Sequence, residues 1–511
     1  MPAKIYSCTT CGLDGQIIEV EADLIGEAAK FIIVGLPDAA VTEAKERVRS
    51  AIKNCDVAFP RQKIVVNLAP ADIKKVGPAF DLPIAISVLI TKGYLELTKD
   101  DKEAVFVGEL ALDGTLRPIT GVLPIALLLK DLKLKRLYLP AQNAAEANLI
   151  SGIEIYPVKN LGQLLSHLKA KTLIKPLTKA STSNVAKTRQ ILSFTKIKGQ
   201  RQAKRALEIA TAGNHNLLMV GPPGSGKTLL AKAMPELLPT LTLAEALEVT
   251  KIYSVAGLLL ANEPLITQRP FRSPHHTASG IALVGGGSFP KPGEITLAHR
   301  GVLFLDELSE FPRTVLENLR QPLEDGVVTI SRASQSLQFP ARFTLVAAAN
   351  PCPCGYLTDA EKDCQCTPSQ ILRYQKRISG PLLDRFDLQI EVPRVKFFDL
   401  QSQTPAGEIQ TILKRIDQAR AIQLARFKQN IIKTVIYTNS EISNQNIEEL
   451  CPLEDDGKKL LKEAMLKFHL TARGYHRLIK VARTIADLAN SEEIKTAHLA
   501  EALQFRISGE R

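Results

Sequence analysis

Apolar and polar positions alternate with two different periods in the first third of the chain. The segments KIVVNLA (63–69) and AVFVGELAL (104–112) have the composition of β-strands, whereas DAAVTEAKERVRSAIKNC (38–55) repeats its apolar residues at helical spacing. Gly- and Pro-containing segments such as VGLPD and LDGTLRP mark the turns between them. Residues 1–170 are therefore predicted to form an α/β domain.

The rest of the chain divides into three regions by the same criteria. Residues 171–195 have weak periodicity and many Thr, Ser and Lys residues, which predicts a linker. Strand-like and helical segments alternate again in residues 196–395, which predicts a parallel α/β sheet. Residues 396–511 are mostly helical in pattern, and we expect a helical lid or bundle there.

Length and composition limit the class of protein. A chain of 511 residues is too long for one core, so we expect more than one domain. No apolar stretch reaches the roughly 18 residues of a membrane span, and MPAKIYSCTT lacks the apolar core of a signal peptide. We therefore expect a cytoplasmic protein without a membrane segment, in which cysteine thiols stay reduced.

The positive charge of the chain is unevenly distributed. The net charge is +12, and the interval between Glu154 and Glu208 holds no acidic residue but twelve Lys and Arg residues. A concentrated basic stretch favours a polyanion as partner, most simply nucleic acid. A solvated basic linker has the same composition, so charge alone leaves both interpretations open.

A phosphate-binding loop follows the apolar segment NLLMV. It has the G-x4-G-K-T pattern between a strand and a helix, and it consists of Gly221, Pro222, Pro223, Gly224, Ser225, Gly226, Lys227 and Thr228. Its glycines allow backbone N–H groups to surround phosphate oxygens, and the following helix directs its positive end at the same anion. Lys227 can reach the outer phosphates of a nucleotide, and the Thr228 hydroxyl can bind Mg²⁺.

Two later apolar segments end in residues suited to phosphate hydrolysis. GVLFLDEL contains Asp306, which can hold the Mg²⁺ shell, and Glu307, which can activate the attacking water. FTLVAAAN ends in Asn350, whose neutral amide can bind that water or the terminal phosphate.

Two arginines complete this predicted catalytic set. Arg385 in ISGPLLDRFD suits the charge of a phosphoryl transition state when it is supplied across a subunit boundary, and Arg473 in ARGYHRLIKVAR can close a helical lid onto the nucleotide. For each arginine a surface ion pair is the alternative explanation.

These elements, in this order, resemble those of AAA+ ATPases. The segments RPFRSPHHTAS, LFLDELSEF, AANPCPCG, RISGPLLDRFDL and IVGLPDAAVTEAKERVRSAIKN are similar to the magnesium-chelatase-like AAA+ family called YifB or ComM. The resemblance covers nearly the whole chain. It implies ATP and Mg²⁺ as cofactors, a homo-oligomeric ring such as a hexamer, and Walker A, Walker B, sensor 1, arginine finger and sensor 2 roles for the residues named above.

The family also carries two hairpin insertions in its ATPase domain. By resemblance these insertions correspond to Phe271–Glu294 and Val327–Pro340. The first is rich in Gly, Pro and cations, as a pore-facing loop would be. Its candidates for contact with a threaded polymer are Arg272, His275, His276 and Lys291, with ordinary loop residues as the alternative.

The N-terminal domain of the family resembles the Lon protease domain, an α/β domain of the ribosomal S5 type. Lon-type proteolysis needs a serine nucleophile and a lysine base. The matching positions hold Ala79 in GPAFD and Leu123 in LRPITGVL. We therefore expect this domain to lack the catalytic dyad and peptidase activity.

Three functions are compatible with this reading. The resemblance implies an ATP-driven motor on single-stranded or branched DNA, a helicase or branch-migration factor in homologous recombination or natural transformation. A chelatase-type motor that remodels a protein partner is the second hypothesis. An ATP-dependent protease or unfoldase is the third, and the missing dyad argues against the protease.

Four of the eight cysteines lie in the segment NPCPCGYLTDAEKDCQC. Cys352, Cys354, Cys364 and Cys366 can satisfy a tetrahedral Zn²⁺, which would be structural because no position remains for water. Cys-x-Cys pairs are tighter than the usual zinc-binding spacing, so reduced cysteines packing a loop are the alternative.

Overall fold

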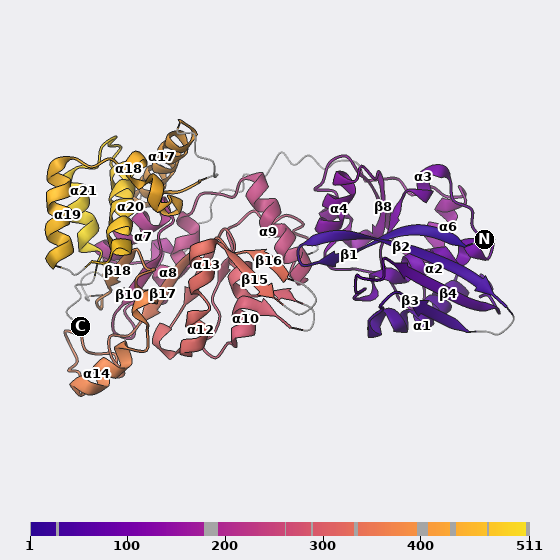
Figure 1. Ribbon diagram of the computed structural model, residues 1–511, viewed down its shortest axis with the longest axis horizontal. Coiled ribbons are helices and arrows are strands. Elements are labelled where there is room, and N and C mark those ends of the chain that lie inside the picture. The colour runs from indigo at the N-terminus through magenta and orange to yellow at the C-terminus, as the bar shows by residue number, and fades with distance from the viewer. Residues whose placement is uncertain are drawn as a thin grey trace. The chain divides into compact units, whose positions relative to one another are not determined.

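The computed structural model of the protein consists of two compact units, Met1–Val185 with Leu243–Thr267, and Ala186–Thr242 with Gln268–Arg511. It describes residues 2–26, 30–177, 193–260, 262–287, 290–331, 336–395, 407–429, 436–467 and 470–506 (Figure 1). Most of the predicted linker, residues 178–192, lies outside this part of the chain. Within the described residues no helix is long and apolar enough to cross a membrane.

The first unit is built on a mixed sheet in the order β3-β4-β2-β1-β5-β8-β9. Its strands are β1 (Ala3–Cys11), β2 (Asp14–Ile25), β3 (Phe31–Val34), β4 (Lys63–Ala69), β5 (Val105–Phe106), β8 (Arg136–Pro140) and β9 (Glu154–Val158). The pairs β1–β2 and β2–β4 are antiparallel and the others are parallel. The strand predicted at 63–69 is confirmed. The one predicted at 104–112 divides into β5 and β6 (Glu109–Leu110), because the chain turns to pair β6 with β7 (Leu116–Arg117).

Helices of the first unit include α1 (Ala39–Lys53), α2 (Asp81–Thr91), α4 (Val122–Asp131) and α6 (Leu161–Leu168). The helix predicted at 38–55 is confirmed as α1. It begins where the Asp38 carboxylate accepts the N–H of Val41 at 2.8 Å, a standard N-cap. The α/β prediction for this region is therefore confirmed, whereas its likeness to Lon protease domains stays a prediction.

Residues 243–267 depart from the predicted boundaries, because they belong to the first unit and not to the 196–395 domain. Their helix, α9 (Leu243–Ala256), packs on α4, where Leu247 contacts a buried apolar cluster. Ser254 donates a hydrogen bond of 2.5 Å to the buried Glu146 carboxylate, and its carbonyl accepts the Gly121 N–H at 3.1 Å. These apolar and polar contacts attach the segment to the first unit.

The second unit is built on a five-stranded sheet in the order β11-β14-β17-β10-β18. Its strands are β10 (Leu217–Val220), β11 (Phe271–Arg272), β14 (Val302–Leu305), β17 (Thr344–Ala349) and β18 (Leu388–Glu391). All four neighbouring pairs are parallel, which confirms the predicted parallel sheet. The strands β10, β14 and β17 are fully buried, as expected for a sheet covered by helices such as α7 (Arg201–Gly213) and α8 (Lys227–Leu237) on its faces.

The predicted helical region forms α17 (Glu408–Gln429), α18 (Ile447–Leu450), α19 (Asp455–Lys467), α20 (Ala472–Leu488) and α21 (Thr496–Gln504). These helices gather beside β18 in Figure 1. Their buried residues, such as Ile416 and Ile485, belong to the same apolar cluster as Met219 and Leu388 of the sheet. One continuous core joins these helices to the sheet in a single compact unit, and the boundary of a separate lid domain at 396–511 stays a prediction.

Both predicted hairpins are present. The first contains β12 (Gly285–Gly286) and β13 (Lys291–Pro292), and the second contains β15 (Val327–Ser331) and β16 (Ser336–Pro340). Residues 288–289 and 332–335, between the paired strands, lie outside the described part of the chain.

The loop after β17 lies directly against the phosphate loop. Gly355 has φ +84°, and a Cβ atom there would lie 2.7 Å from Cδ of Pro223. Only glycine combines a positive φ with an approach this close. The cysteine-containing segment therefore supports the phosphate loop through one glycine–proline contact.

Gly355→Ala is expected to weaken ATP binding about tenfold. The left-handed conformation costs a non-glycine residue about 1–2 kcal/mol, and the new methyl group displaces Pro223. Titration with a fluorescent ATP analogue measures the effect. Gly380→Ala is the matched control, because no atom lies within 4 Å of the added Cβ. Unchanged affinity in Gly355→Ala would show that this contact does not shape the loop.

Candidate active site

Polar side chains meet at the carboxyl ends of three neighbouring strands. β10 leads into the phosphate loop, β14 into Asp306 and Glu307, and β17 into Asn350. The three strands pair in parallel register, so these ends share one edge of the sheet. β10 lies between β17 and β18, the last two strands of this sheet in chain order.

The phosphate loop is held from two sides. Gln200 donates to the carbonyl of Ser225 at 2.7 Å, and a Cβ atom on Gly221 would collide with the carbonyl of Val392, directly after β18. Gly224 and Gly226 have φ of 77° and 87°, and α8 begins at the following lysine. This backbone and the positive end of α8 fit a bound phosphate group.

Lys227 points into the loop. Its Nζ donates to the carbonyl oxygens of the first two loop residues at 2.7 and 2.9 Å, and it lies 3.4 Å from Oδ1 of Asn350. Burial lowers the pKa of Lys227, and the carboxylates of Asp306 and Glu307 act in the opposite direction. The structure thus brings the predicted lysine, asparagine and carboxylates together.

The predicted magnesium ligands are in contact. The Thr228 hydroxyl donates to Oδ2 of Asp306 at 2.8 Å, and Oδ1 accepts the N–H of Glu307 at 3.0 Å. A hydroxyl and a carboxylate beside a phosphate site are the protein ligands that Mg²⁺ uses with nucleotides. The residues present therefore fit the metal.

Glu307 has a partner that sequence reasoning missed. Its backbone is left-handed, with φ 51°, and its half-exposed carboxylate lies 3.5 Å from Nδ1 of His276. The His276 ring also packs edge-on against Phe311. His276 belongs to the first inserted segment, where a parallel pairing of β11 with β14 brings the chain back to Glu307. No local pattern connects the two residues.

The four candidates for polymer contact do not form one free surface. Arg272 is held by both carboxylate oxygens of Glu294, at 2.6 and 2.7 Å, and His276 lies against the predicted base. His275 interacts with the Thr277 hydroxyl at 2.8 Å, while Lys291 is exposed. Arg272 is therefore engaged by Glu294, and its contact with a polymer stays a prediction.

Part of the basic interval is also engaged within the second unit. Lys204 lies 3.3 Å from Glu408, and Arg205 forms ion pairs of 2.8 Å with both Glu208 and Glu501. These two residues fasten α7 and are not open to nucleic acid.

Arg385 lies at the opposite edge of the sheet from the phosphate loop. It precedes β18, and its carbonyl accepts from the side chain of Asn216, which precedes β10, at 3.0 Å. The parallel strand β10 separates this edge from the phosphate loop by about 13 Å, at about 3.3 Å per residue. Arg385 therefore points away from the phosphates of its own chain.

Arg473 lies beside Arg385. Both guanidinium groups contact the Glu324 carboxylate, at 2.6 Å from Arg385 and 3.3 Å from Arg473. Arg477, one turn further along α20, lies 3.4 Å from Asp387 and fixes the helix at this edge. Arg473 therefore lies at the edge opposite the phosphate loop of its own chain, and its contact with a nucleotide stays a prediction.

Arg385 is buried among other cations. Burial lowers the pKa of its guanidinium, Glu324 raises it, and nearby Arg473, Arg477 and Arg320 lower it further. An anion at this edge would relieve that repulsion. The guanidinium groups at this edge can therefore bind a phosphate group, although the phosphate loop lies at the opposite edge.

The four clustered cysteines converge. The Sγ atoms of Cys352, Cys354, Cys364 and Cys366 all lie within 4.8 Å of one another, and three of the separations are 3.4, 3.5 and 3.6 Å. Four thiolates at 2.3 Å from one Zn²⁺ are about 3.8 Å apart in a tetrahedron. The donor set and its spacing therefore fit a structural zinc ion.

Backbone N–H groups surround these sulfur atoms. The N–H groups of Tyr356 and Gln365 point at Cys354, and the first of them is the main cause that lowers its pKa to about 6. Hydrogen bonds of this kind stabilise the thiolate, which is the form that binds metal. Arg394, just after β18, ties the loop down through Asp359 at 2.6 Å.

The positions expected to replace a protease dyad lie together in the first unit. Leu123 is fully buried in an apolar cluster, and Ala79 packs against the same cluster. Neither side chain carries a nucleophile or a base.

Comparison with known proteins agrees with this geometry. The family model described as "Magnesium chelatase, subunit ChlI" matches residues 193–400, "Subunit ChlI of Mg-chelatase" matches residues 20–143, and "Magnesium chelatase, subunit ChlI C-terminal" matches residues 408–506.

Similar whole proteins share nearly the full length of the chain. The Competence protein ComM of Haemophilus influenzae is 45% identical, with 99% of this chain and 97% of that protein covered. The Uncharacterized protein YifB of Escherichia coli is 42% identical over 98% of this chain and 96% of its own length. The Magnesium-chelatase 38 kDa subunit of Rhodobacter capsulatus is 29% identical over 40% of this chain and 57% of its own. The chain therefore belongs to the magnesium-chelatase-like AAA+ ATPases of the YifB and ComM type.

Proposed function

We propose that this protein is an ATP-hydrolysing ring motor that acts on single-stranded or branched DNA. The observation that carries the proposal is the division of the catalytic groups between two edges of one sheet. Arg385 and Arg473 share Glu324 at the edge opposite the phosphate loop, so their phosphate partner comes from another copy of the chain. A closed ring, with a hexamer as the proposed size, supplies that copy at every site.

Each residue has a defined part in hydrolysis. Lys227 binds the outer phosphates, and Asn350 holds the water in line with the terminal phosphorus. Glu307 takes the proton of that water as its oxygen attacks, and the bond to the leaving diphosphate oxygen breaks. Thr228 and Asp306 hold Mg²⁺, which neutralises phosphate charge when bound. Arg385 of the neighbouring copy stabilises the charge on the transferred group, with Arg473 beside it.

DNA as the substrate rests on two kinds of support. The net charge of +12 favours a polyanion, and the Haemophilus relative is named for competence. We extend this to branch migration or unwinding in recombination during natural transformation. A chelatase-type motor that remodels a protein partner is the second candidate, because all three matching family models are of magnesium chelatase subunits.

The remaining parts support this motor. The first unit has Ala79 and Leu123 at the proposed dyad positions, so we assign it no peptidase activity. The cysteine cluster is assigned one structural Zn²⁺, which would hold the loop between Asn350 and Arg385 and contribute no reacting group.

Glu307→Gln is expected to slow ATP hydrolysis by about 100-fold or more, because the general base is lost, while ATP and DNA are still bound. ATPase rates with and without single-stranded and branched DNA, together with anisotropy across a salt series, measure both effects. Asp455→Asn on exposed α19 is the control. Undiminished hydrolysis would reject Glu307 as the base. A wild-type protein without salt-dependent DNA binding or DNA stimulation would reject the DNA motor.

The purified protein is expected to contain about one zinc ion per chain, bound by the four converged thiolates. Elemental analysis should show loss of that zinc in Cys364→Ser and its retention in Cys451→Ser, where the thiol is buried elsewhere. Chelator should lower the thermal unfolding temperature of the wild type but not that of Cys364→Ser. If the wild-type protein contained no metal, the prediction would be wrong, and the four cysteines would be reduced thiols that pack the loop.

A further inference from the structure

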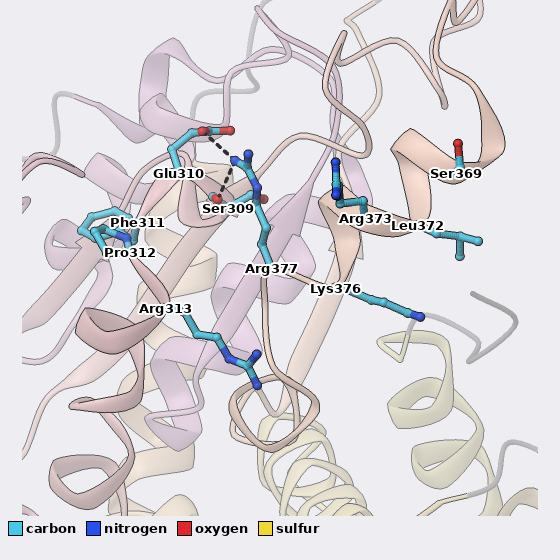
Figure 2. A pocket seen from close by; sticks show the side chains of 10 residues that line it. All are labelled: Ser309, Glu310, Phe311, Pro312, Arg313, Ser369, Leu372, Arg373, Lys376 and Arg377. Atoms are coloured by element: carbon cyan, nitrogen blue, oxygen red, sulfur yellow. Dashed lines mark hydrogen bonds and ion pairs between the residues drawn. The ribbon is translucent and has the colours of Figure 1, made fainter.

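A basic hollow of about 810 Å³ lies beside the segment that follows Glu307 (Figure 2). We call it the basic groove, and its charged residues are Glu310, Arg313, Arg373, Lys376 and Arg377. We propose that the basic groove binds the phosphate backbone of nucleic acid. This inference rests on the proposed function and gives the DNA a contact outside the inserted hairpins.

The charge of the basic groove carries the first step. Its one carboxylate, Glu310, is engaged by Arg377 at 3.0 Å, as the dashed line in Figure 2 shows. Arg313, Arg373 and Lys376 are exposed, and no acidic partner accompanies them among the described residues. Three uncompensated cations on one concave surface attract a polyanion.

The two walls of the basic groove are tied to the active site. One wall is the turn Leu308–Glu310, which directly follows the base Glu307. The other is α14 (Pro368–Gln375), which begins at a Thr367 capping box directly after Cys366. Gln375 donates to the carbonyl of Pro351, next to Asn350, at 3.2 Å. A ligand that bridges the walls therefore acts on the two segments that position the base and the asparagine.

Nucleic acid fits the basic groove better than a protein segment. Leu372, which is 47% exposed, shares the hollow with Arg373, Lys376 and Arg377, whereas the centre of a protein interface is depleted of charged residues. The cations come from two separate elements and are spread across an open hollow, as successive phosphates require.

The double variant Arg373→Gln/Lys376→Gln tests the basic groove. The slope of log affinity against log salt for single-stranded DNA should decrease in magnitude by about 1.4, from about 0.7 for each lost phosphate contact. DNA stimulation of the ATPase should fall in parallel. Lys458→Gln/Lys459→Gln on α19 removes the same charge from another exposed surface and should keep the wild-type slope.

The outcomes separate this inference from the proposed function. A wild-type slope in Arg373→Gln/Lys376→Gln, with DNA binding intact, would overturn the basic groove and leave the DNA motor standing. If the double variant kept the wild-type slope but its ring dissociated, as measured by light scattering, the basic groove would also be overturned. The surface would then be assigned to contacts between copies of the chain. Absence of DNA binding in the wild type would reject the motor itself.

A second inference comes from the opposite edge of the sheet. Glu324 lies on α13 (Arg320–Asp325), which ends at Gly326 and leads directly into strand β15 of the second hairpin. We infer that Glu324 is a positioning residue that holds Arg385 and Arg473 until a neighbouring nucleotide takes its place. This inference rests on the proposed function, in which the two arginines act on the nucleotide of a neighbouring copy.

The contacts of Glu324 support exchange with a phosphate. Arg385 is 5% exposed, yet its Nε atom has no hydrogen-bond partner within the described structure. The carboxylate of Glu324 is half exposed and offers the same charge that a terminal phosphate brings. When a phosphate binds the two guanidinium groups, Glu324 is released, and the strand that follows α13 is free to shift.

Glu324→Gln is expected to raise basal ATP hydrolysis by about fivefold and to remove its stimulation by DNA, because the competing charge is gone. Glu324→Asp keeps the charge and should restore both properties in part. Glu361→Gln, an exposed acidic position on the cysteine loop, is the control. A loss of hydrolysis in Glu324→Gln, or full DNA stimulation, would show that Glu324 is only a structural partner of Arg385.

Discussion

The parallel direction of the strands in the second unit determines where every reacting group lies. Because β10, β14 and β17 run the same way, their carboxyl ends bring the phosphate loop, Asp306 and Asn350 to one edge. The same direction puts Arg385 at the amino end of β18, on the other edge. No side-chain rotation brings Arg385 to the phosphate loop of its own chain, so the proposed role of Arg385 in hydrolysis needs a second copy of the chain.

Both edges of that sheet are connected to an inserted hairpin. At the carboxyl edge, His276 of the first insertion lies 3.5 Å from the base Glu307. At the amino edge, Glu324 precedes the second hairpin and holds Arg385 at 2.6 Å. A displacement of either hairpin therefore acts on a charged group of the nucleotide machinery, and the reverse also holds because equilibrium coupling is reciprocal.

The sequence predicted those site residues that directly follow an apolar strand. The phosphate loop, the carboxylates after β14 and the asparagine after β17 follow from an apolar run and the residue that ends it. His276, Glu324 and the Gly355–Pro223 contact depend on segments far apart in the chain, which no local period encodes. The sequence also does not show that Arg473 lies beside Arg385, at the edge opposite the phosphate loop. Residues 243–267 were misplaced because their partner, α4, lies in the first unit, far from them in the chain.

The cysteine loop shows how a segment without reacting groups can control the site. It touches the phosphate loop through Gly355, is held to the end of β18 through Arg394 and Asp359, and leads into α14, which carries Arg373. A loop of this length cannot keep three such contacts by hydrophobic burial, because most of its residues are exposed. Four thiols converge within 4.8 Å, and the proposed zinc ion would replace that missing core with a cross-link. In the proposed mechanism Asn350 acts on the attacking water, and the cysteines would fix the loop that follows it.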